Sequence, residues 1–259
     1  MITSLQNERV KLVRTLSQRK TRREQGRFFI EGLRAIDDAL SLKACPDFVF
    51  YTNAFMRGAS AQTLLSKLAA EQIELIEVSD KVMAACSDTE TPPGILAVLP
   101  LPQLDPIARP GFVLIADALR DPGNLGALLR SAAAAGVDAV WLAPGTVDAY
   151  NPKVVRGAMG AHFRIPIAVI EWDAITARVS GIKVWLADGE AEVSYTQVDW
   201  TKPCALIVGG EAHGASVEAT QLANGRVRIP MLRDVESLNA GVAASVILFE
   251  AARQRRGDA

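Results

Sequence analysis

The sequence predicts an α/β fold whose larger, C-terminal part is a parallel sheet. Two observations support this prediction. Apolar runs such as FVLIADAL (112–119), VDAVWLA (137–143) and ALIVGG (205–210) are typical of strands that are buried on both faces. Segments with helical start and stop signals alternate with these runs, so we expect helices to cover both faces of the sheet.

The first 98 residues predict a smaller α/β domain. Short apolar strands are expected at FVFYT (48–52), IELIEV (73–78) and GILAVL (94–99), and a helix at AQTLLSKLAAEQ (61–72). LPLPQLDPIARPG (99–111) contains four prolines and has neither a helical nor a strand period, which is typical of a stiff linker. We therefore expect domain boundaries at 1–98, 99–111 and 112–259.

The elements after the linker follow in order. NLGALLRSAAAAG (124–136) predicts a helix that ends at Gly136, because glycine readily adopts the left-handed conformation of a helix end. NPKVVRGAMGAHF (151–163) begins a helix with Asn151 as N-cap and Pro152 in its first turn. Further strands are expected at IPIAVI (165–170), IKVWLAD (182–188) and VRIPM (227–231), and a long helix at 237–256.

Composition and charge exclude several classes of protein. The net charge of −1 over 259 residues argues against a global polyelectrolyte partner, although a local basic patch remains compatible with it. The scattered Cys45, Cys86 and Cys204 form no CxxC pair and are expected to be semi-buried thiols without a disulfide or zinc. His162 and His213 lack metal-ligand spacing, so no metal is expected and both histidines are interpreted as structural or loop residues. Neither a signal core nor an apolar run of about 18 residues occurs, so we expect a cytoplasmic protein without membrane segments.

The stretch ALIVGGEAHGAS (205–216) has the glycine spacing of a phosphate-binding loop. A P-loop needs a lysine to neutralise the β- and γ-phosphates, but Ala215 stands at that position and Glu211 adds a negative charge. No GxGxxG fingerprint occurs elsewhere. The loop is therefore expected to bind a ligand that is less anionic than a nucleoside triphosphate.

Three loops leave the carboxyl ends of predicted strands, where open α/β sheets bind their ligands. They are RDPGNLGALLR (120–130), GGEAHGAS (209–216) and PMLRDVESLN (230–239). Asn124 is either a plain helix N-cap or a site residue, and capping explains only one of Ser237 and Asn239 well.

Arg130 is the one cation of an otherwise apolar helix, and burying a guanidinium unpaired is costly. It therefore needs an anion. The candidates are an external ligand or an internal salt bridge to Glu211 or Asp117.

Four segments resemble, in order, the motifs of the SpoU (TrmH-like) RNA 2′-O-ribose methyltransferases. They are DPGNLGALLRSAAAAGVDAV, NPKVVRGAMGAHF, LIVGGEAHG and VRIPMLRDVESLNAGVAASVILFEAARQ, which span nearly the whole C-terminal domain. The segment ITSLQNERVKLVRTLSQRKTRREQGRFFIEGLRAIDDAL resembles the family's substrate-binding domain, which is L30e-like. The resemblance implies a Rossmann-like sheet of the SPOUT class with a deep trefoil knot, and a homodimer formed through the catalytic domain.

The resemblance also implies S-adenosylmethionine as methyl donor, a ligand without phosphates. The residues expected to bind it are Leu206, Val208, Gly209, Gly210, Glu211, Ile229, Pro230, Met231, Leu238 and Asn239. Catalysis would depend on Asn124, Arg130, Glu211, Ser237 and Asn239. Arg130 would hold the target phosphate and stabilise the developing alkoxide, because a guanidinium with a pKa above ~12 is a poor base.

A basic segment between Arg9 and Arg27 predicts the RNA-binding surface. The candidate phosphate contacts are Arg9, Lys11, Arg14, Arg19, Lys20, Arg22, Arg23 and Arg27, with Lys153 and Arg156 extending them toward the active site. Deletion of residues 1–27 is expected to weaken RNA binding. The substrate is expected to be ribosomal RNA rather than transfer RNA; a non-catalytic RNA-binding or antibiotic-shielding relative is the alternative.

Three positions depart from the family pattern. Gly210 stands where asparagine is usual, Gly214-Ala215 where Gly-Leu is usual, and Leu232–Asp234 where a glycine is usual. These departures are expected to reshape the rim of the donor pocket.

Overall fold

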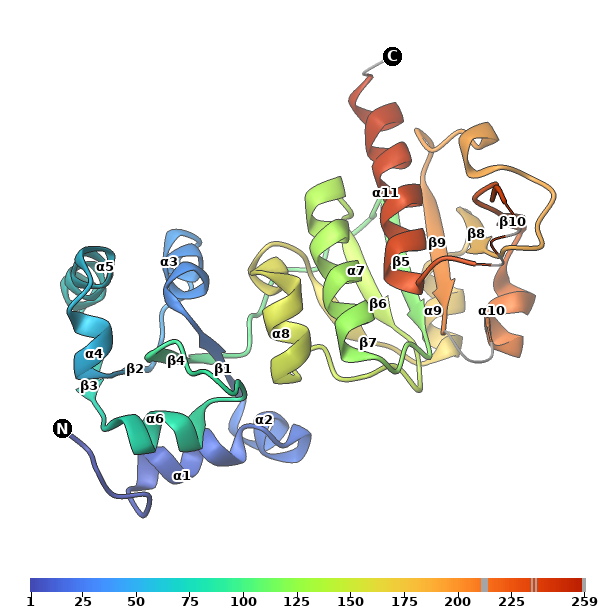
Figure 1. Cartoon of the computed structure of the whole chain (residues 1–259). Coiled ribbons are helices and arrows are strands. Elements are labelled where there is room, and N and C mark those ends of the chain that lie inside the picture. Colours follow the sequence, from blue (N-terminus) through green and yellow to red (C-terminus); the bar gives the residue numbers. More distant parts are fainter. Residues whose placement is uncertain (211–213, 234, 236, 258–259) are drawn as a thin grey trace. The chain divides into compact units, whose positions relative to one another are not determined.

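The computed structural model describes residues 1–210, 214–233, 235 and 237–257 (Figure 1). The chain forms two compact units. The first contains Met1–Gln103 and Tyr150–Phe163, and the second contains Leu104–Ala149 and Arg164–Ala259. The single boundary predicted at 99–111 is therefore incomplete, since a later segment returns to the first unit.

A four-stranded mixed sheet forms the centre of the first unit. Its strands are β1 (Arg27–Glu31), β2 (Phe48–Tyr51), β3 (Glu74–Glu77) and β4 (Ile95–Pro100), in the order β1-β4-β2-β3. β2 and β3 are parallel, and β4 is antiparallel to both of its neighbours. Leu99 pairs with Phe28, so the first two residues of the predicted linker belong to β4 instead.

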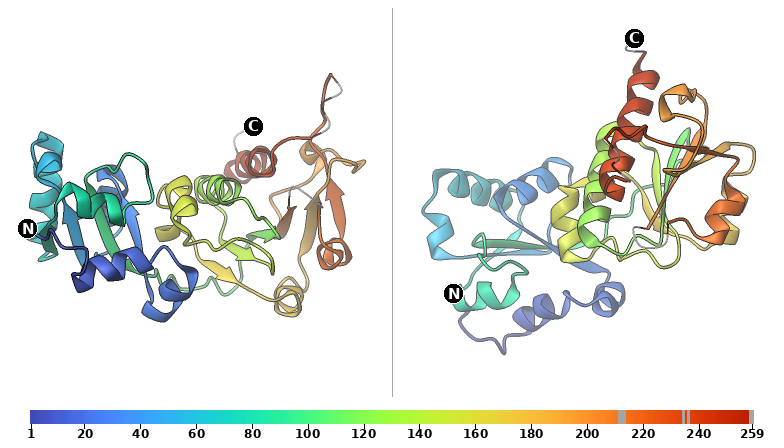
Figure 2. Two further views of the ribbon diagram at one scale, coloured as in Figure 1. Left: turned by 60° about the horizontal axis from the view of Figure 1, so that its bottom comes forward. Right: turned by 45° about the vertical axis from the view of Figure 1, so that its right-hand side comes forward.

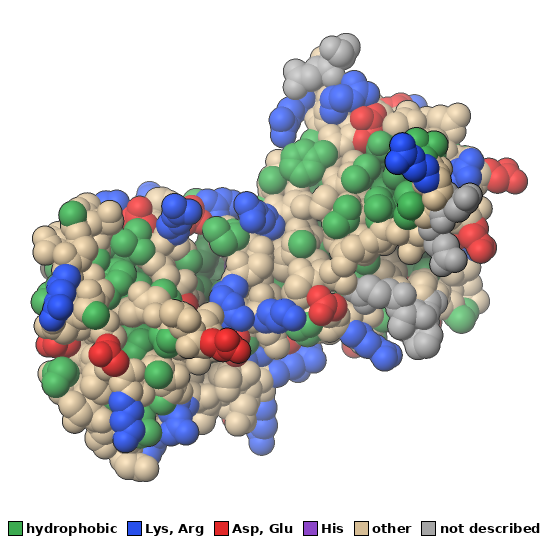
Figure 3. Space-filling model, viewed as in Figure 1, with side chains coloured by type: hydrophobic (Ala, Val, Ile, Leu, Met, Phe, Trp, Pro, Cys, Tyr) green, Lys and Arg blue, Asp and Glu red, His purple; other side chains and the backbone are tan. Residues whose placement is uncertain are grey.

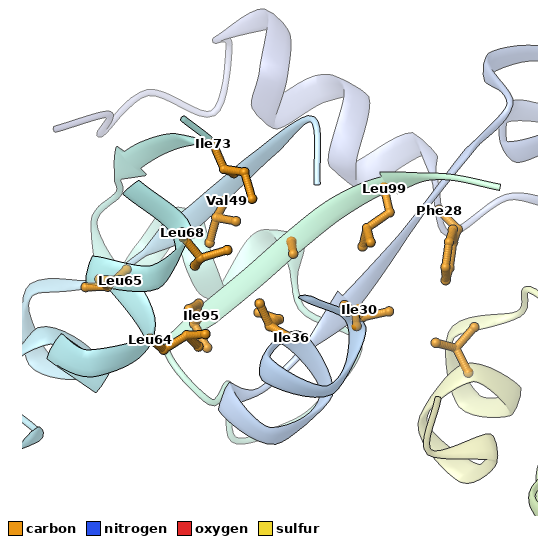
Figure 4. Close-up of a cluster of buried hydrophobic side chains, with 13 residues drawn as sticks. Phe28, Ile30, Ile36, Val49, Leu64, Leu65, Leu68, Ile73, Ile95 and Leu99 are labelled. Atoms are coloured by element: carbon orange, nitrogen blue, oxygen red, sulfur yellow. The ribbon is translucent and has the colours of Figure 1, made fainter. Parts of the chain in front are cut away.

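Helices cover both faces of this sheet because alternate strand residues are apolar on opposite faces. Val49 belongs to a core with residues of α3 and α5 (Figure 4), whereas Phe48 and Phe50 belong to a second core with residues of α1 and α6. The helices are α1 (Glu8–Thr15), α2 (Arg19–Gln25), α3 (Leu33–Ser41), α4 (Asn53–Met56), α5 (Ala59–Ala70) and α6 (Asp80–Cys86).

The segment that returns to the first unit contains α8 (Pro152–Ala158) and the 3-10 helix η1 (Ala161–Phe163). Asn151 caps α8 by accepting the Lys153 amide at 2.9 Å, as predicted. Val155 is buried in the same core as the residues of α3 and α5, and Tyr150 and Phe163 pack against it. This apolar packing against β1 explains why the segment leaves the unit to which the sequence assigned it.

The second unit contains the predicted parallel sheet. Its strands are β5 (Phe112–Asp117), β6 (Ala139–Leu142), β7 (Ile167–Val169), β8 (Lys183–Ala187), β9 (Cys204–Gly209) and β10 (Gly225–Val227), in the order β10-β8-β9-β5-β6-β7. All pairs are parallel. The strand predicted at 227–231 is shorter than expected and ends at Val227. From β5 the chain adds β6 and β7 on one side and then β8, β9 and β10 on the other, so the direction of the strand order reverses between β5 and β9. Parallel sheets bind their ligands at such a point.

Helices cover both faces of this sheet (Figures 1 and 2). α7 (Pro122–Ala135) and α11 (Ala240–Arg256) lie together on one face, while apolar residues of α9 (Trp172–Arg178) and α10 (Val217–Leu222) pack on the other. The Ser131 and Ser245 hydroxyls form a 2.7 Å hydrogen bond between α7 and α11. A further 3-10 helix, η2, covers Tyr195–Gln197. In the described part of the chain, no helix is both long and apolar enough to cross a membrane.

Candidate active site

A cavity of about 470 Å³ lies at the carboxyl ends of β8, β9 and β10. Its volume is within the usual range for small-molecule sites. The predicted donor-binding residues that line it are Val208, Gly209, Gly210, Ile229, Met231, Leu238 and Asn239. Ser237, a predicted catalytic residue, lines it as well. The structure thus brings the second and third predicted loops to one cavity.

Two predicted donor-binding residues do not line the cavity. Leu206 is fully buried within β9, where it pairs with Leu114 and Trp185, so its backbone is occupied in the sheet. Pro230 lies between two lining residues without lining the cavity itself. Glu211, predicted for both donor binding and catalysis, lies outside the described residues.

The loop beyond β9 depends on close backbone approach at two glycines. A Cβ at Gly209 would lie 2.8 Å from the carbonyl carbon of Gly214, and a Cβ at Gly210 would lie 2.6 Å from the Ala118 carbonyl oxygen. Neither position accepts a side chain without a backbone shift. Gly210, where the family pattern has asparagine, is therefore required by the local backbone of this chain.

Asp117, at the carboxyl end of β5, holds the far side of the same loop. Its side chain is fully buried, and its Oδ2 accepts the Ser216 amide at 2.7 Å. Ser216 is the N-cap of α10, with its hydroxyl accepting the Ala219 amide. The second carboxylate oxygen, Oδ1, is buried and has no hydrogen-bond partner among the described residues. The sequence suggested Asp117 only as a salt-bridge partner of Arg130, and the structure shows a different role.

Asn124 and Asn239 are joined although they are far apart in the sequence. The Asn239 side-chain amide donates to Asn124 Oδ1 at 2.7 Å, and Asn239 Oδ1 caps α11 by accepting the Gly241 and Val242 amides. The interpretation of Asn124 as an N-cap is wrong, because Asp121 caps α7 and accepts the Asn124 amide at 2.8 Å. The first and third loops therefore meet through these two side chains.

Arg130 lies on α7 as an exposed residue. Within the described ranges it forms no ion pair, and the alternative of a bridge to Asp117 is not realised because that carboxylate is buried at Ser216. A pair with Glu211 falls outside those ranges. An exposed guanidinium in this position is accessible to an anion from solution.

Sequence reasoning missed one carboxylate of the cavity, Asp188. It follows β8, and its Oδ2 accepts a 3.1 Å hydrogen bond from Arg226 while its backbone amide donates to the Val227 carbonyl. The rule that located the other loops, a polar residue at the carboxyl end of a strand, also applies to the predicted strand IKVWLAD.

The basic segment is divided between structural and exposed cations. Arg22 is only 3% exposed, and its guanidinium donates to the Leu16 and Ser17 carbonyls at 2.7 and 2.8 Å. Its predicted contact with RNA is therefore wrong. Arg9 and Arg27 pair with Glu74 and Asp47, both at 2.5 Å. The exposed cations are Lys11, Arg14, Arg19, Lys20, Arg23 and, on α8, Lys153.

The α1 helix also belongs to a core, since Val10, Val13 and Leu16 are fully buried. Deletion of residues 1–27 would remove these side chains together with β1's first residue. A loss of RNA binding after this deletion could therefore result from unfolding of the core. For this reason the deletion does not test whether the segment binds RNA.

The cysteines are free, and two of them are buried. Burial raises the pKa of the Cys86 thiol to about 11 and raises the pKa of Cys204 as well. Cys45 is exposed, contrary to the expectation of a semi-buried thiol. His162 is buried with its ring 5.1 Å from that of Tyr150, which confirms a structural position. His213 is not among the described residues.

Two family models match the chain. The model of the SpoU rRNA Methylase family matches residues 111–249, and that of the MRM3-like substrate binding domain matches residues 7–97. The chain is 31% identical to the 23S rRNA (guanosine(2553)-2′-O)-methyltransferase RlmP of Bacillus subtilis, over 96% of this chain and 97% of the relative. It is 33% identical to the mitochondrial rRNA methyltransferase 3 of Mus musculus, over 93% of this chain and 71% of the relative.

Solved structures with the same fold include two with bound AdoMet. The SpoU methyltransferase AviRb of Streptomyces viridochromogenes, in complex with AdoMet, superposes with a TM-score of 0.85 at 29% identity, covering 97% of this chain and 99% of that one. The AdoMet-bound rRNA methyltransferase of Sinorhizobium meliloti superposes with a TM-score of 0.82 at 31% identity, covering 97% of each chain.

Proposed function

Since the chain belongs to the SpoU rRNA methylase family, we propose that it transfers the methyl group of S-adenosylmethionine to a ribose 2′-hydroxyl of ribosomal RNA. The observation that carries this proposal is the cavity at the carboxyl ends of β8, β9 and β10, which is bordered by the residue pair Asn124–Asn239. The cavity and the pair lie in the unit that matches the methylase family model.

The lining of the cavity fits S-adenosylmethionine, which supplies the methyl group and carries no phosphate. Backbone at Gly209 and Gly210 approaches the ligand space closely, and apolar side chains such as Ile229 and Leu238 surround it. Asp188 contributes a carboxylate that suits a hydroxyl or ammonium group. Among the described lining residues, Arg228 is the cation and Asp188 the carboxylate.

Methyl transfer to a hydroxyl requires alignment of the two reactants and stabilisation of the developing negative charge. From the resemblance, we assign the charge stabilisation to Arg130, which does not line the cavity but is exposed and unpaired within the described ranges. Asn124 and Asn239 hold each other through their amide groups, and this fixes the loops on both sides of the reaction space. Ser237 and, from the resemblance, Glu211 complete the proposed catalytic set.

The proposed homodimer is supported by an apolar surface on α11. Val242 and Phe249 are 49% and 48% exposed, and Figure 3 shows hydrophobic side chains gathered over α7 and α11. Such a patch on a soluble domain marks an interface. The deep trefoil knot and the L30e-like relationship of the first unit belong to the same proposal, by resemblance to the family. The cytoplasm is the proposed location, because ribosomal RNA is the proposed substrate.

The RNA contacts are assigned to the exposed cations of the first unit, which matches a substrate-binding family model. Phosphate contacts of this kind supply affinity and position rather than sequence specificity. Ribosomal RNA is favoured over transfer RNA because the relatives named above are rRNA methyltransferases.

The test incubates the protein with labelled S-adenosylmethionine and separate pools of unmodified ribosomal and transfer RNA, followed by nuclease digestion and mass spectrometry. A 2′-O-methyl nucleoside from ribosomal RNA supports the proposal, and one from transfer RNA alone corrects the substrate. Absence of both label and donor binding refutes the enzyme assignment and favours a non-catalytic relative.

The role of Arg130 is tested by Arg130→Lys, which we expect to lower kcat by about 100-fold or more because a lysine lacks the planar guanidinium. Arg34→Lys, an exposed arginine of α3, is the matched control and should retain activity. Equal activity of the two variants would exclude the geometric role.

A further inference from the structure

A second, smaller cavity lies within the first unit, between β1, α3 and the α8–η1 segment. Its volume is about 210 Å³. Ile30, Ala35, Val155 and Phe163 provide apolar walls, and the charged residues Glu31 and Arg156 also line it. Nothing in the proposed methyl transfer uses this cavity.

Aromatic rings surround one side of the cavity. Phe28, which points toward α8 in Figure 4, has its ring centre 6.0 Å from that of Phe163, 6.2 Å from that of His162 and 5.2 Å from that of Tyr150. Three of these four rings, those of Phe28, His162 and Phe163, line the cavity. Such a wall suits a planar ring, because aromatic stacking on a nucleobase is insensitive to base identity.

The backbone at the cavity holds an unusual conformation. Met159 has φ 46° although it is not glycine, and Gly160 follows with φ 80°. Met159 is the left-handed C-cap that ends α8, a position where glycine is usual, so a methionine there carries backbone strain. Met159 lines the cavity and is nevertheless 50% exposed, so its flexible thioether side chain is accessible to a ligand.

Charged groups are fixed beside the apolar walls. Arg156 pairs with Asp88 at 2.6 Å, and Glu31 accepts the Asp88 amide at 3.0 Å as well as the Ser87 hydroxyl. The Arg156–Asp88 pair is partly exposed, so its net contribution to stability is small and a phosphate can compete for the guanidinium. A partly exposed guanidinium therefore lies next to an aromatic pocket.

We infer that this cavity binds an unpaired nucleobase of the RNA substrate, an inference that rests on the proposed function. The cavity is smaller than the usual 300–1,000 Å³ of a whole-ligand site, so it fits a base while the ribose and phosphate stay at the mouth. The β1 and α3 side of the cavity lies in the segment that matches the substrate-binding domain model, and the α8–η1 side in the segment that matches the methylase model. Together with the ring cluster and Arg156, this favours RNA over other ligands.

Methionine methyl signals provide the experiment, because the full chain contains five methionines. Met159 lines the base pocket, whereas Met231 lines the proposed donor cavity. The protein is labelled with ¹³C-methyl methionine and titrated with AMP, GMP, CMP and UMP, then separately with S-adenosylmethionine. At least one nucleotide should shift Met159 saturably without shifting Met231, and S-adenosylmethionine should shift Met231.

Two variants locate the bound nucleotide. Ala35→Leu fills the cavity and should abolish the Met159 shift; Ala69→Leu, on the exposed face of α5, is the matched control and should leave it unchanged. Arg156→Gln should weaken nucleotide binding by about tenfold. A change in the methyl signal of the buried Met83 would show that Ala35→Leu disturbs folding. In that case Arg156→Gln provides the test. In methylation of ribosomal RNA, Ala35→Leu should raise KM by about 5- to 150-fold.

Three results would overturn the inference. They are the absence of a Met159 shift with every nucleotide, a shift that persists in folded Ala35→Leu, and an unchanged KM for ribosomal RNA in that variant. The last result would assign the cavity to a free nucleotide instead. None of them affects the proposed function, which fails separately if S-adenosylmethionine leaves Met231 unshifted.

Discussion

Removal of the Asp117 carboxylate should weaken donor binding beyond its effect on folding. In Asp117→Ala, the partly buried Ser216 amide loses its 2.7 Å acceptor. Leaving such a donor unsatisfied costs about 1–3 kcal/mol. The Gly209–Gly210 backbone and Ala215, beside Ser216, line the donor cavity. Binding of the donor must therefore reorder this loop, and the same free energy predicts a rise of about 5- to 150-fold in the Kd for S-adenosylmethionine.

Asp138→Ala is the matched control, because the Asp138 carboxylate also accepts backbone amides, but at the opposite end of β5. Its Oδ2 accepts the Gly111 and Phe112 amides at 2.6 and 2.9 Å, away from the donor cavity. Urea unfolding should show that both variants are destabilised by about 1–3 kcal/mol. Isothermal titration calorimetry should show weakened donor binding in Asp117→Ala alone. An unchanged Kd in Asp117→Ala, or an equal rise in both variants, would refute the reasoning.

Three further predictions concern the exposed cations of the first unit and the cysteine thiols. Combined replacement of the exposed Arg14, Arg19 and Arg23 by glutamine should lower the magnitude of the slope d log K/d log [salt] of RNA binding by about 2, as measured by filter binding, and leave donor binding intact. An unchanged slope would exclude phosphate contacts by these residues. In the native protein DTNB should modify Cys45 rapidly and the buried thiols only after unfolding, and simultaneous reaction of all three would contradict the assigned burial. Because burial raises the pKa of Cys86 to about 11, the unfolded chain ionises first and stability falls as pH rises from about 8.5 to about 11; urea titrations should show a smaller fall in Cys86→Ala.

The local elements of the second unit could be predicted from the sequence because their signals are local. The apolar run at Phe112–Asp117 is a buried strand in a parallel sheet, and Gly136 adopts φ 76° where the helix ends. Strand-end loops predicted the cavity for the same reason, since parallel strands place their carboxyl ends at one edge of the sheet. Asp188 was missed although this rule includes it.

Side-chain partners could not be predicted in the same way, because they depend on the tertiary structure. Arg22 is part of a basic run, yet it points inward to the Leu16 and Ser17 carbonyls. The sequence of α8 has an apolar face but does not indicate which core will bury it. Likewise, the hydrogen bond between Asn124 and Asn239 joins residues 115 positions apart, and helix-capping rules describe only one of them correctly.

The return of residues 150–163 to the first unit determines how this protein can be divided. The chain passes between units three times, after Gln103, after Ala149 and after Phe163. A single protease cut in the proline-rich segment leaves 150–163 attached to the second unit at both ends, so residues 1–103 are then held only by packing against that segment. A nicked protein should stay together on gel filtration through this apolar contact. A fragment that starts at residue 104 would retain Val155 without the core that buries it and should aggregate. Domain exchange with relatives thus requires three junctions rather than one.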